Sequence, residues 1–271
     1  MSGETVSIVY IDLMGRLGNQ MFQIANGLSY GIENNLKAYL PEDRKKSHLI
    51  FHKLPRIKNP NSLPVYEYKS IEYKKVPYNG EIRLFGYFQS EDYFKSNKDA
   101  IIKMFKNISL EPDIRLKIDR NIRDIGHEMS ITISIHIRRG DYLKLRKIHP
   151  VQDESYYKRG LLAISNKLNI EFEILKKKYK LIIFSDDIGW CKSSGMFDSF
   201  NCNFIEGNED YIDMFLMSEC KHNIIANSSF SWWGAYLNES EDKVVVSPKK
   251  WFGSNGPKSW NSIYCDKWII V

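Results

Sequence analysis

The chain has 271 residues, enough for one large domain or two of ordinary size, and its 43% hydrophobic residues can fill sizeable cores. Its net charge of +6 comes from scattered lysines and arginines, which argues against a nucleic-acid binder, because such proteins concentrate their cations in a stripe. Residues 37–75 carry ten Lys/Arg against four Asp/Glu. We interpret this stretch as a solvated face that could also contact an acidic acceptor or a membrane surface.

The cysteines and the apolar runs indicate the compartment. Four cysteines show neither a Cys-x-x-Cys pair nor metal-ligand spacing, which predicts free thiols in a reducing compartment. No apolar run approaches the ~20 residues that span a bilayer. The polar start, Met1 to Glu4, is not typical of a signal peptide. We therefore expect a cytoplasmic protein without a transmembrane segment.

The first half of the chain has an α/β pattern. Residues 6–13 are apolar and β-branched, glycines break the run at 15–18, and apolar residues recur near helical spacing through 19–34. A short strand at 37–40 completes a strand–turn–helix–strand opening. Residues 53–80 contain four prolines and predict loops with short strands.

The middle of the chain predicts one more strand and two helices. The strand covers 82–87, and Ser90 is a natural N-cap for a helix over 90–106 with acidic residues in its first turn. A second helix over 112–128 would lead to the next domain. We therefore expect an N-terminal α/β domain over residues 1–128.

The second half alternates strands and helices more regularly. The predicted strands are 131–137, 180–184, 201–205, 222–226 and 243–247, and the predicted helices are 153–168, 209–220 and 229–237. Such alternation predicts a parallel sheet covered on both faces. We assign it to a C-terminal domain over residues 129–271, whose final residues could pack back on the N-terminal domain.

The strand at 131–137 ends abruptly in Arg138, Arg139, Gly140 and Asp141. Open α/β sheets bind ligands just outside the carboxyl ends of their strands. The two parallel N–H donors of an arginine match two phosphate oxygens. This segment therefore predicts a site for a phosphate-bearing ligand, most simply a nucleotide. The alternative is a surface turn with an Arg–Asp ion pair.

Two further polar turns follow predicted strands. The turn from Gly15 to Gln20 would let the backbone approach an anion at a helix N-terminus, with Asn19 adding a directional hydrogen bond, although it could also be a structural glycine turn. Asp186 and Asp187 follow the strand at 180–184. They could accept from a base or a ribose hydroxyl, or one of them could cap the next helix.

A third polar turn, from Asn227 to Ser229, joins the strand at 222–226 to a helix. Its residues are natural N-caps, and a helix N-terminus is a ready anion site. The aromatic residues that follow, Phe230, Trp232 and Trp233, either pack beneath the turn or form the wall of a sugar pocket. Because strand ends of one sheet share an edge, the polar groups that follow the strands at 131–137, 180–184 and 222–226 together favour a ligand site over isolated turns.

These segments resemble glycosyltransferase family 11, the α-1,2-fucosyltransferases. The matching segments are 15–23, 86–91, 136–142, 184–187 and 226–234. The resemblance implies a GT-B-like α/β fold, in which two Rossmann-like domains with parallel sheets face a central cleft, with the acceptor on the N-terminal side and GDP-fucose on the C-terminal domain. It also implies inverting, metal-independent transfer of L-fucose to the 2-hydroxyl of a terminal galactose on an oligosaccharide acceptor, without a cofactor.

The resemblance also implies roles for individual residues. Catalytic roles fall to Arg138, which would hold the β-phosphate of the leaving GDP, and to His136 and Asn19. The implied donor contacts are Arg16, Arg138, Arg139, Asp141, Asp186, Asp187, Asn227, Ser228, Ser229 and Phe230. The proton acceptor stays open among Asp12, Glu91 and Asp92.

Two rival functions follow from the residues alone. One is transfer with another regiochemistry or from another nucleotide sugar, which the same diphosphate site would serve. The other is non-catalytic carbohydrate binding, which the many tyrosines and tryptophans could support.

Overall fold

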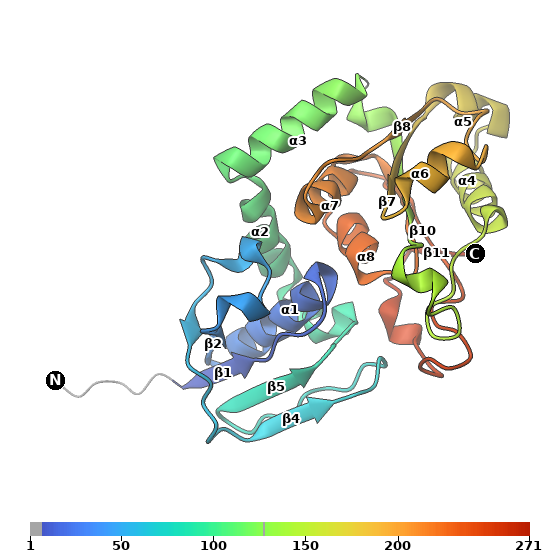
Figure 1. Cartoon of the computed structure of the whole chain (residues 1–271). Helices are drawn as coiled ribbons and strands as arrows, with labels where there is room; N and C mark the ends of the chain where they lie inside the picture. Colours follow the sequence, from blue (N-terminus) through green and yellow to red (C-terminus); the bar gives the residue numbers. More distant parts are fainter. Residues whose placement is uncertain (1–6, 127) are drawn as a thin grey trace. The chain divides into compact units, whose positions relative to one another are not determined.

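The computed structural model describes residues 7–126 and 128–271 (Figure 1). The chain forms two compact units. The first contains the residues up to Ile108 together with Ser259–Cys265, and the second contains Ser109–Lys258 together with Asp266–Val271. The polar N-terminus, the first residue of the strand expected at 6–13 and residue 127 of the helix expected at 112–128 lie outside the described residues.

The first unit is built on a five-stranded parallel sheet with strand order β3-β2-β1-β5-β4. Its strands are β1 (Ile8–Ile11), β2 (Lys37–Pro41), β3 (Arg56–Ile57), β4 (Val65–Tyr68) and β5 (Ile82–Gly86), and its helices are α1 (Leu17–Asn34) and α2 (Lys98–Ser109). The strand–helix–strand opening expected from the sequence is confirmed. α1 buries Phe22, Ile24 and Ala25 completely, which fixes its N-terminus just beyond the end of β1.

The helix expected over 90–106 is wrong in its first half. Ser90 caps a 3₁₀ turn at Glu91–Tyr93 by accepting from the backbone N–H of Asp92 at 3.2 Å, and the α-helix begins only at Lys98. Phe94 interrupts the helical path, with φ of −140°. Its ring is fully buried and lies 6.4 Å from the ring of Phe22. Burial of Phe94 against α1 therefore overrides the capping signal.

Glu72 anchors the C-terminal segment of the first unit. Its carboxylate accepts from the backbone N–H of Asn261 at 2.6 Å and from the hydroxyls of Ser259 and Ser262. The Ser262 hydroxyl in turn accepts from the backbone N–H of Tyr73 at 2.9 Å. Burial raises the pKa of Glu72, but these hydrogen bonds lower it by more, so the folded-state pKa lies below the ordinary value.

This arrangement makes the segment sensitive to acid. Because the folded-state pKa of Glu72 is lowered, its stabilising effect is present above the ordinary value of 4.5 and is lost as the pH falls through the folded value. At pH 7, Glu72→Gln should speed amide exchange at Asn261 and Ser262 about tenfold, which is the scale of a hydrogen bond to a charged group. Hydrogen–deuterium exchange checks this, and the gap between variant and wild type should close in acid. Equal exchange at pH 7 contradicts the anchoring role.

The second unit is built on a six-stranded parallel sheet with strand order β11-β10-β9-β6-β7-β8. Its strands are β6 (Thr132–Ile137), β7 (Lys180–Ser185), β8 (Cys202–Phe204), β9 (His222–Ile224), β10 (Val245–Ser247) and β11 (Ile269–Ile270). Its helices are α3 (Pro112–Ile125), α4 (Glu154–Leu168), α5 (Phe172–Lys178), α6 (Ile188–Ser193), α7 (Asp210–Glu219) and α8 (Ser229–Tyr236). The expected alternation of strands and helices is confirmed.

The division between the units falls before α3, whereas the sequence places it after the helix expected at 112–128. α3 belongs to the second unit because it packs along α7. Arg115 on α3 forms an ion pair with Glu219 at 2.8 Å. The final residues divide between the units, since β11 returns to the second sheet and pairs with β10.

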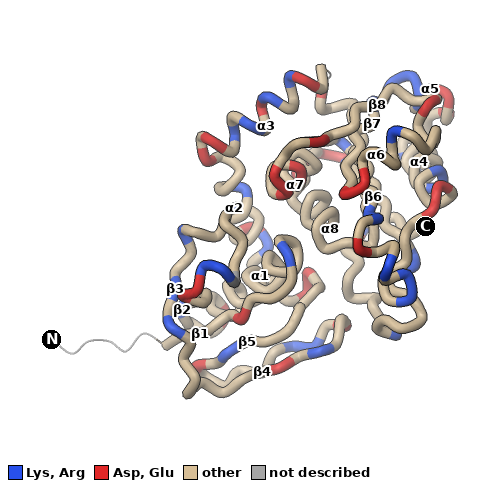
Figure 2. Tube along the Cα trace, viewed as in Figure 1, with Lys and Arg blue, Asp and Glu red and all other residues tan. Residues whose placement is uncertain are grey.

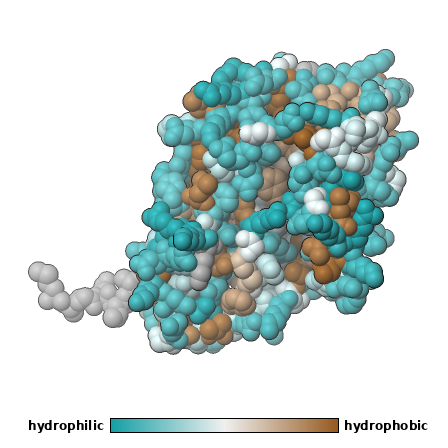
Figure 3. All heavy atoms as spheres, viewed as in Figure 1, coloured by the Kyte–Doolittle hydropathy of each residue, from teal (hydrophilic) through white to brown (hydrophobic). Residues whose placement is uncertain are grey.

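The core of the second unit surrounds β6, whose six residues are all buried. Trp232 and Trp233 on α8 are fully buried, so they pack in the core and do not form a sugar-pocket wall. Within the described residues the four cysteines form no disulfide. Cationic residues are spread over both units (Figure 2). The face in view is largely hydrophilic, with small apolar patches (Figure 3).

A helix that crosses a bilayer needs about 20 predominantly apolar residues. Across residues 7–126 and 128–271, none of the helices combines the length and the apolar character that a membrane crossing requires.

Candidate nucleotide site

The register of the second sheet gathers the expected site residues at one edge. β6 lies between β7 and β9, with Ile137 opposite Ser185 on β7 and Ile135 opposite Ile224 on β9. Continuing both registers by one to three residues brings Arg138, Asp186 and Asn227 to the same level. The carboxyl edge of this sheet therefore collects three of the polar turns that the sequence singled out.

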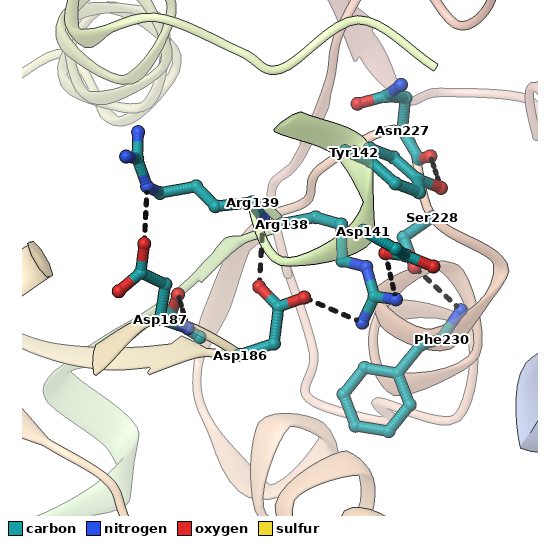
Figure 4. Close-up of polar contacts among 10 residues, drawn as sticks. Arg138, Arg139, Asp141, Tyr142, Asp186, Asp187, Asn227, Ser228 and Phe230 are labelled. Atoms are coloured by element: carbon teal, nitrogen blue, oxygen red, sulfur yellow. Dashed lines mark hydrogen bonds and ion pairs between the residues drawn. The ribbon is translucent and has the colours of Figure 1, made fainter. Parts of the chain in front are cut away.

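Arg138 is clamped between two carboxylates. Its Nη1 lies 3.1 Å from Oδ2 of Asp186, and its Nη2 donates to Oδ1 of Asp141 at 2.6 Å (Figure 4). The ring of Tyr142 lies 5.3 Å from the guanidinium. The Arg–Asp pair of a simple surface turn is present. However, only 16% of the Arg138 side chain is exposed, and the second carboxylate fixes the orientation of the fork.

Arg139 points away from Arg138, toward a different partner (Figure 4). Its Nε donates to Oδ2 of Asp187 at 3.0 Å, and its guanidinium lies 3.6 Å from the ring centroid of Trp190. Asp187 also caps α6 by accepting from the backbone N–H of Trp190. The capping role that the sequence left open for this aspartate is confirmed, and Trp190 is a contact that the sequence analysis missed.

Asp186 binds the backbone at the start of the turn that follows β6, in addition to the side chain of Arg138. Its Oδ1 accepts from the backbone N–H of Arg139 at 2.8 Å. A Cβ atom at Gly140 would lie only 2.4 Å from Oδ2 of the same carboxylate, so the close approach needs glycine. Asp186 therefore binds both arginines in this structure, and its contact with guanine or ribose stays a prediction.

His136 lies inside the sheet. Its side chain is 4% exposed, its ring lies 5.4 Å from the ring of Phe230, and Nδ1 finds no hydrogen-bond partner in the described part of the chain. Burial, with a smaller contribution from the charge of Arg138, lowers the pKa of His136 to about 3. The imidazole is therefore neutral at pH 7 in this structure.

The turn before α8 is already organised by its own hydrogen bonds. The Ser228 hydroxyl accepts from the backbone N–H of Phe230 at 3.4 Å, and the Ser228 N–H donates to Ala226 at 2.8 Å. The amides expected to meet a diphosphate at Ser228 and Phe230 are thus engaged within the turn. Ser229 begins the helix, and the positive end of α8 remains at the same edge of the sheet.

Asn227 is buried, and it joins three loops. Its amide donates to the carbonyl of Trp251 at 2.9 Å, its side-chain oxygen accepts from Gln152 at 3.1 Å, and its carbonyl accepts from the Tyr142 hydroxyl at 3.0 Å. The side chain of Asn227 therefore braces these loops, and the donor contact that the resemblance implies for it stays a prediction. Gln152 and the partner role of Tyr142 had no signal in the sequence pattern.

In the first unit, Asn19 lies in the first turn of α1. Its Oδ1 accepts from Nε2 of Gln89, a residue just beyond β5, at 2.7 Å. Gly15 has φ of +74°, and a Cβ atom there would lie 2.4 Å from Nδ2 of Asn19. The glycine turn therefore has a structural reason, and it also fixes the amide of Asn19. Arg16 is exposed at the N-cap position and makes no capping hydrogen bond through its side chain.

The three candidate proton acceptors differ in their surroundings. Both carboxylate oxygens of Asp12 accept from Arg83, with Nη2 at 2.8 Å from Oδ1. Asp92 is exposed. The Glu91 side chain is 7% exposed, and its carboxylate lies 3.8 Å from Nζ of Lys98. Both oxygens of Asp12 are therefore engaged by the guanidinium of Arg83, whereas the buried carboxylate of Glu91 has the more distant Lys98 as a cationic neighbour.

Acidic, histidine and cysteine side chains are the usual protein ligands of metal ions. Among residues 7–126 and 128–271, no three of them come together in a way that could hold a metal ion.

The chain is similar to known glycosyltransferases along almost its whole length. The model of glycosyl transferase family 11 matches residues 4–271. The chain is 32% identical to an α-1,2-colitosyltransferase of Escherichia coli, over 98% of this chain and 99% of that protein. It is 27% identical to galactoside α-(1,2)-fucosyltransferase 2 of Mus musculus, over 87% of this chain and 70% of that protein.

A solved structure shares the fold. The α-1,6-fucosyltransferase NodZ, in a crystal soaked with GDP-fucose, matches with a TM-score of 0.52 at 14% identity, over 86% of this chain and 93% of that one. The likeness concerns the fold, which is α/β and GT-B-like with two parallel sheets.

Proposed function

Because the chain belongs to glycosyltransferase family 11, we propose that it transfers L-fucose from GDP-fucose to the 2-hydroxyl of a terminal galactose on a glycan. The transfer inverts the configuration at the sugar carbon and uses no metal ion in this proposal. The observation that best supports this proposal is the position of the Arg138 guanidinium. Two carboxylates hold it at the carboxyl edge of the second sheet, beside the N-terminus of α8.

The chemistry of the leaving group explains why such a fork is useful. As the bond to fucose breaks, negative charge grows on the diphosphate, and groups fixed in place beforehand stabilise this charge in the transition state. A guanidinium has five N–H groups, and the two ion pairs of Arg138 engage one nitrogen each. N–H groups therefore remain for phosphate oxygens, and the positive end of α8 adds to the same field.

We assign the proton acceptor to Glu91 in this proposal. It follows β5 at the edge where Gln89 holds Asn19, and its carboxylate is not held by an arginine fork as that of Asp12 is. A buried carboxylate with one cation at 3.8 Å keeps oxygen lone pairs for a sugar hydroxyl. The attacking hydroxyl must lose its proton on the face opposite GDP.

The similarity to an α-1,2-colitosyltransferase makes colitose the second candidate donor sugar. Colitose is L-fucose without its 3-hydroxyl. A site that hydrogen-bonds a hydroxyl rejects the analogue that lacks it far more strongly than an apolar pocket rejects the analogue that carries it. The choice between the two donors therefore reports directly on the polarity of the sugar pocket.

A donor competition tests this choice. With a methyl β-galactoside as acceptor, kcat/KM for GDP-fucose should exceed that for GDP-colitose by about 10²-fold or more, because the 3-hydroxyl would have a partner in the site. GDP-mannose serves as the unrelated control and should give no product. Preference for GDP-colitose would replace fucose as the transferred sugar. NMR of the product reports the linkage, and a bond to any hydroxyl other than the 2-hydroxyl would contradict the regiochemistry.

We also propose that the enzyme works in the cytoplasm. The four cysteines, with no disulfide among the described residues, suit a reducing compartment.

A further inference from the structure

The loop in which Asp141 binds Arg138 continues into a segment, residues 144–148, that is exposed to solvent. Lys144, Arg146 and Lys147 are exposed. Two aliphatic residues in the same segment are exposed as well, Leu145 by 41% and Ile148 by 37%. Two exposed aliphatic side chains among three cations give this segment the amphipathic character of a surface that lies at a lipid boundary. We call residues 144–148 the outer loop.

A second basic loop lies against the outer loop. The N–H of Gly253 donates to Ile148 at 2.9 Å, and the N–H of Asn255 donates to Lys147 at 2.7 Å. This neighbouring loop adds exposed lysines at positions 249, 250 and 258.

Acidic residues do not balance this charge. The sequence has no Asp or Glu at 142–152 or at 243–265. Of the acids that flank the outer loop, Asp141 pairs with Arg138 and Asp153 caps α4 by accepting from Tyr156 at 2.9 Å, while Glu154 is exposed in the first turn of α4. The two loops therefore present one sign of charge, which contrasts with the mixed charges of residues 37–75.

The outer loop is held rigidly from its inner side. The ring of Tyr142 stacks on His149 with centroids 4.7 Å apart and planes 16° apart, and His149 lies against Phe252. A Cβ atom at Gly253 would lie 2.5 Å from the carbonyl oxygen of Lys147, so the two loops meet as closely as glycine allows. Leu145 and Ile148 are thus presented to solvent by a fixed scaffold.

We propose that the outer loop and the lysines at 249, 250 and 258 dock onto an anionic lipid surface. Lysine and arginine near such a surface are attracted to its charge, while aliphatic side chains insert at the boundary of the acyl chains. A single-stranded nucleic acid would instead favour exposed aromatic rings for stacking. The two rings that flank the outer loop, Tyr142 and His149, stack on each other. Docking would place the other side of the same loop, which clamps Arg138 through Asp141, next to the lipid.

Vesicle cosedimentation tests the proposal with the full chain and no substrate. At roughly physiological salt, where surface charges act over about 8 Å, the wild type should bind vesicles of phosphatidylcholine with one quarter phosphatidylglycerol and should not bind phosphatidylcholine alone. Lys144→Ala with Lys147→Ala should lower partitioning about 30-fold, from two lost cations. Leu145→Ser with Ile148→Ser should lower it about tenfold at unchanged charge.

A matched control removes the same charge elsewhere on the second unit. Lys177 and Lys178 on α5 are exposed, but Glu171 and Glu173 lie in the same segment. Lys177→Ala with Lys178→Ala should leave vesicle binding within twofold. Failure of the wild type to bind anionic vesicles, or equal loss in this control, would overturn the proposal.

Two competitors separate lipid from other anions. Duplex DNA that displaces the vesicles, combined with full binding by the Leu145/Ile148 double variant, would show a general polyanion surface and overturn the lipid assignment. Millimolar inorganic phosphate should not release the vesicles, and release would show an ion site instead. Transfer to a water-soluble galactoside in the absence of vesicles should be unchanged in the loop variants, so loss of docking and loss of activity are read separately.

Discussion

Arg138→Ala is expected to lower kcat/KM for GDP-fucose by about 10²–10³, the scale of deleting one donor that is fixed in place before reaction. The fork is already oriented by Asp141 and Asp186, so the wild type spends little reorganisation when charge grows on the diphosphate. Alanine also leaves the two carboxylates facing each other without their cation. Their repulsion of the donor phosphates adds to the loss.

Two further variants make the Arg138 result specific. Arg138→Lys keeps the charge but loses the planar fork, so it should recover only part of the rate. Arg123→Ala removes an exposed arginine on α3 and should leave the rate unchanged. Activity of Arg138→Ala within tenfold of the wild type would remove Arg138 from the phosphate-binding role.

Glu91→Gln is expected to lower kcat by about 10²–10⁴, the range for loss of a positioned acid–base group. The amide keeps the size of the side chain and its buried position but cannot accept the proton of the attacking hydroxyl. KM for GDP-fucose should stay close to the wild-type value in this variant, because the lost group acts on the acceptor hydroxyl, whereas a purely structural role of Glu91 would change both parameters.

The other two acids provide the controls for Glu91. Asp92→Asn changes an exposed side chain and should keep most of the rate. Asp12→Asn breaks the two-oxygen pairing with Arg83 and should lower thermal stability while keeping most of kcat. If Asp12→Asn lowers kcat by about 10²-fold or more and Glu91→Gln does not, the proton acceptor is Asp12.

The sequence predicts the edge of the second sheet well because the signal is local. β6 is a buried β-branched run, and its abrupt end in Arg138 places the guanidinium at the carboxyl edge whatever the packing around it. The helix start at Ser229 follows equally from its N-cap. Parallel registers then bring Asp186 and Asn227 to the same level, which alternating strands and helices already require.

What the sequence cannot predict is which partner each polar side chain takes. Asp186 and Asp187 are neighbours in the chain, yet one serves Arg138 and the backbone while the other serves Arg139 and the α6 cap. That division depends on the direction in which the strand end turns. The ring of His149 against Tyr142 depends on the path of an irregular loop, for which no periodicity exists.

Tertiary packing also overrides local signals in the first unit. The N-cap at Ser90 is real, but burial of Phe94 limits it to a 3₁₀ turn. Glu72 lies in a stretch that predicts only loops, and its partners at Ser259 and Ser262 are almost two hundred residues away in the chain. Contacts of such separation leave no pattern in a single sequence.

The most direct test of a metal-independent diphosphate site at Arg138 is calorimetric titration with GDP in the presence of EDTA, for the wild type and for Arg138→Ala. We expect micromolar binding of GDP that EDTA does not change. In Arg138→Ala the affinity should weaken by about 10²-fold or more, because the diphosphate loses the guanidinium that binds it. Equal affinity of the two proteins, or binding by the wild type that disappears with EDTA, would contradict a metal-independent diphosphate site built on Arg138.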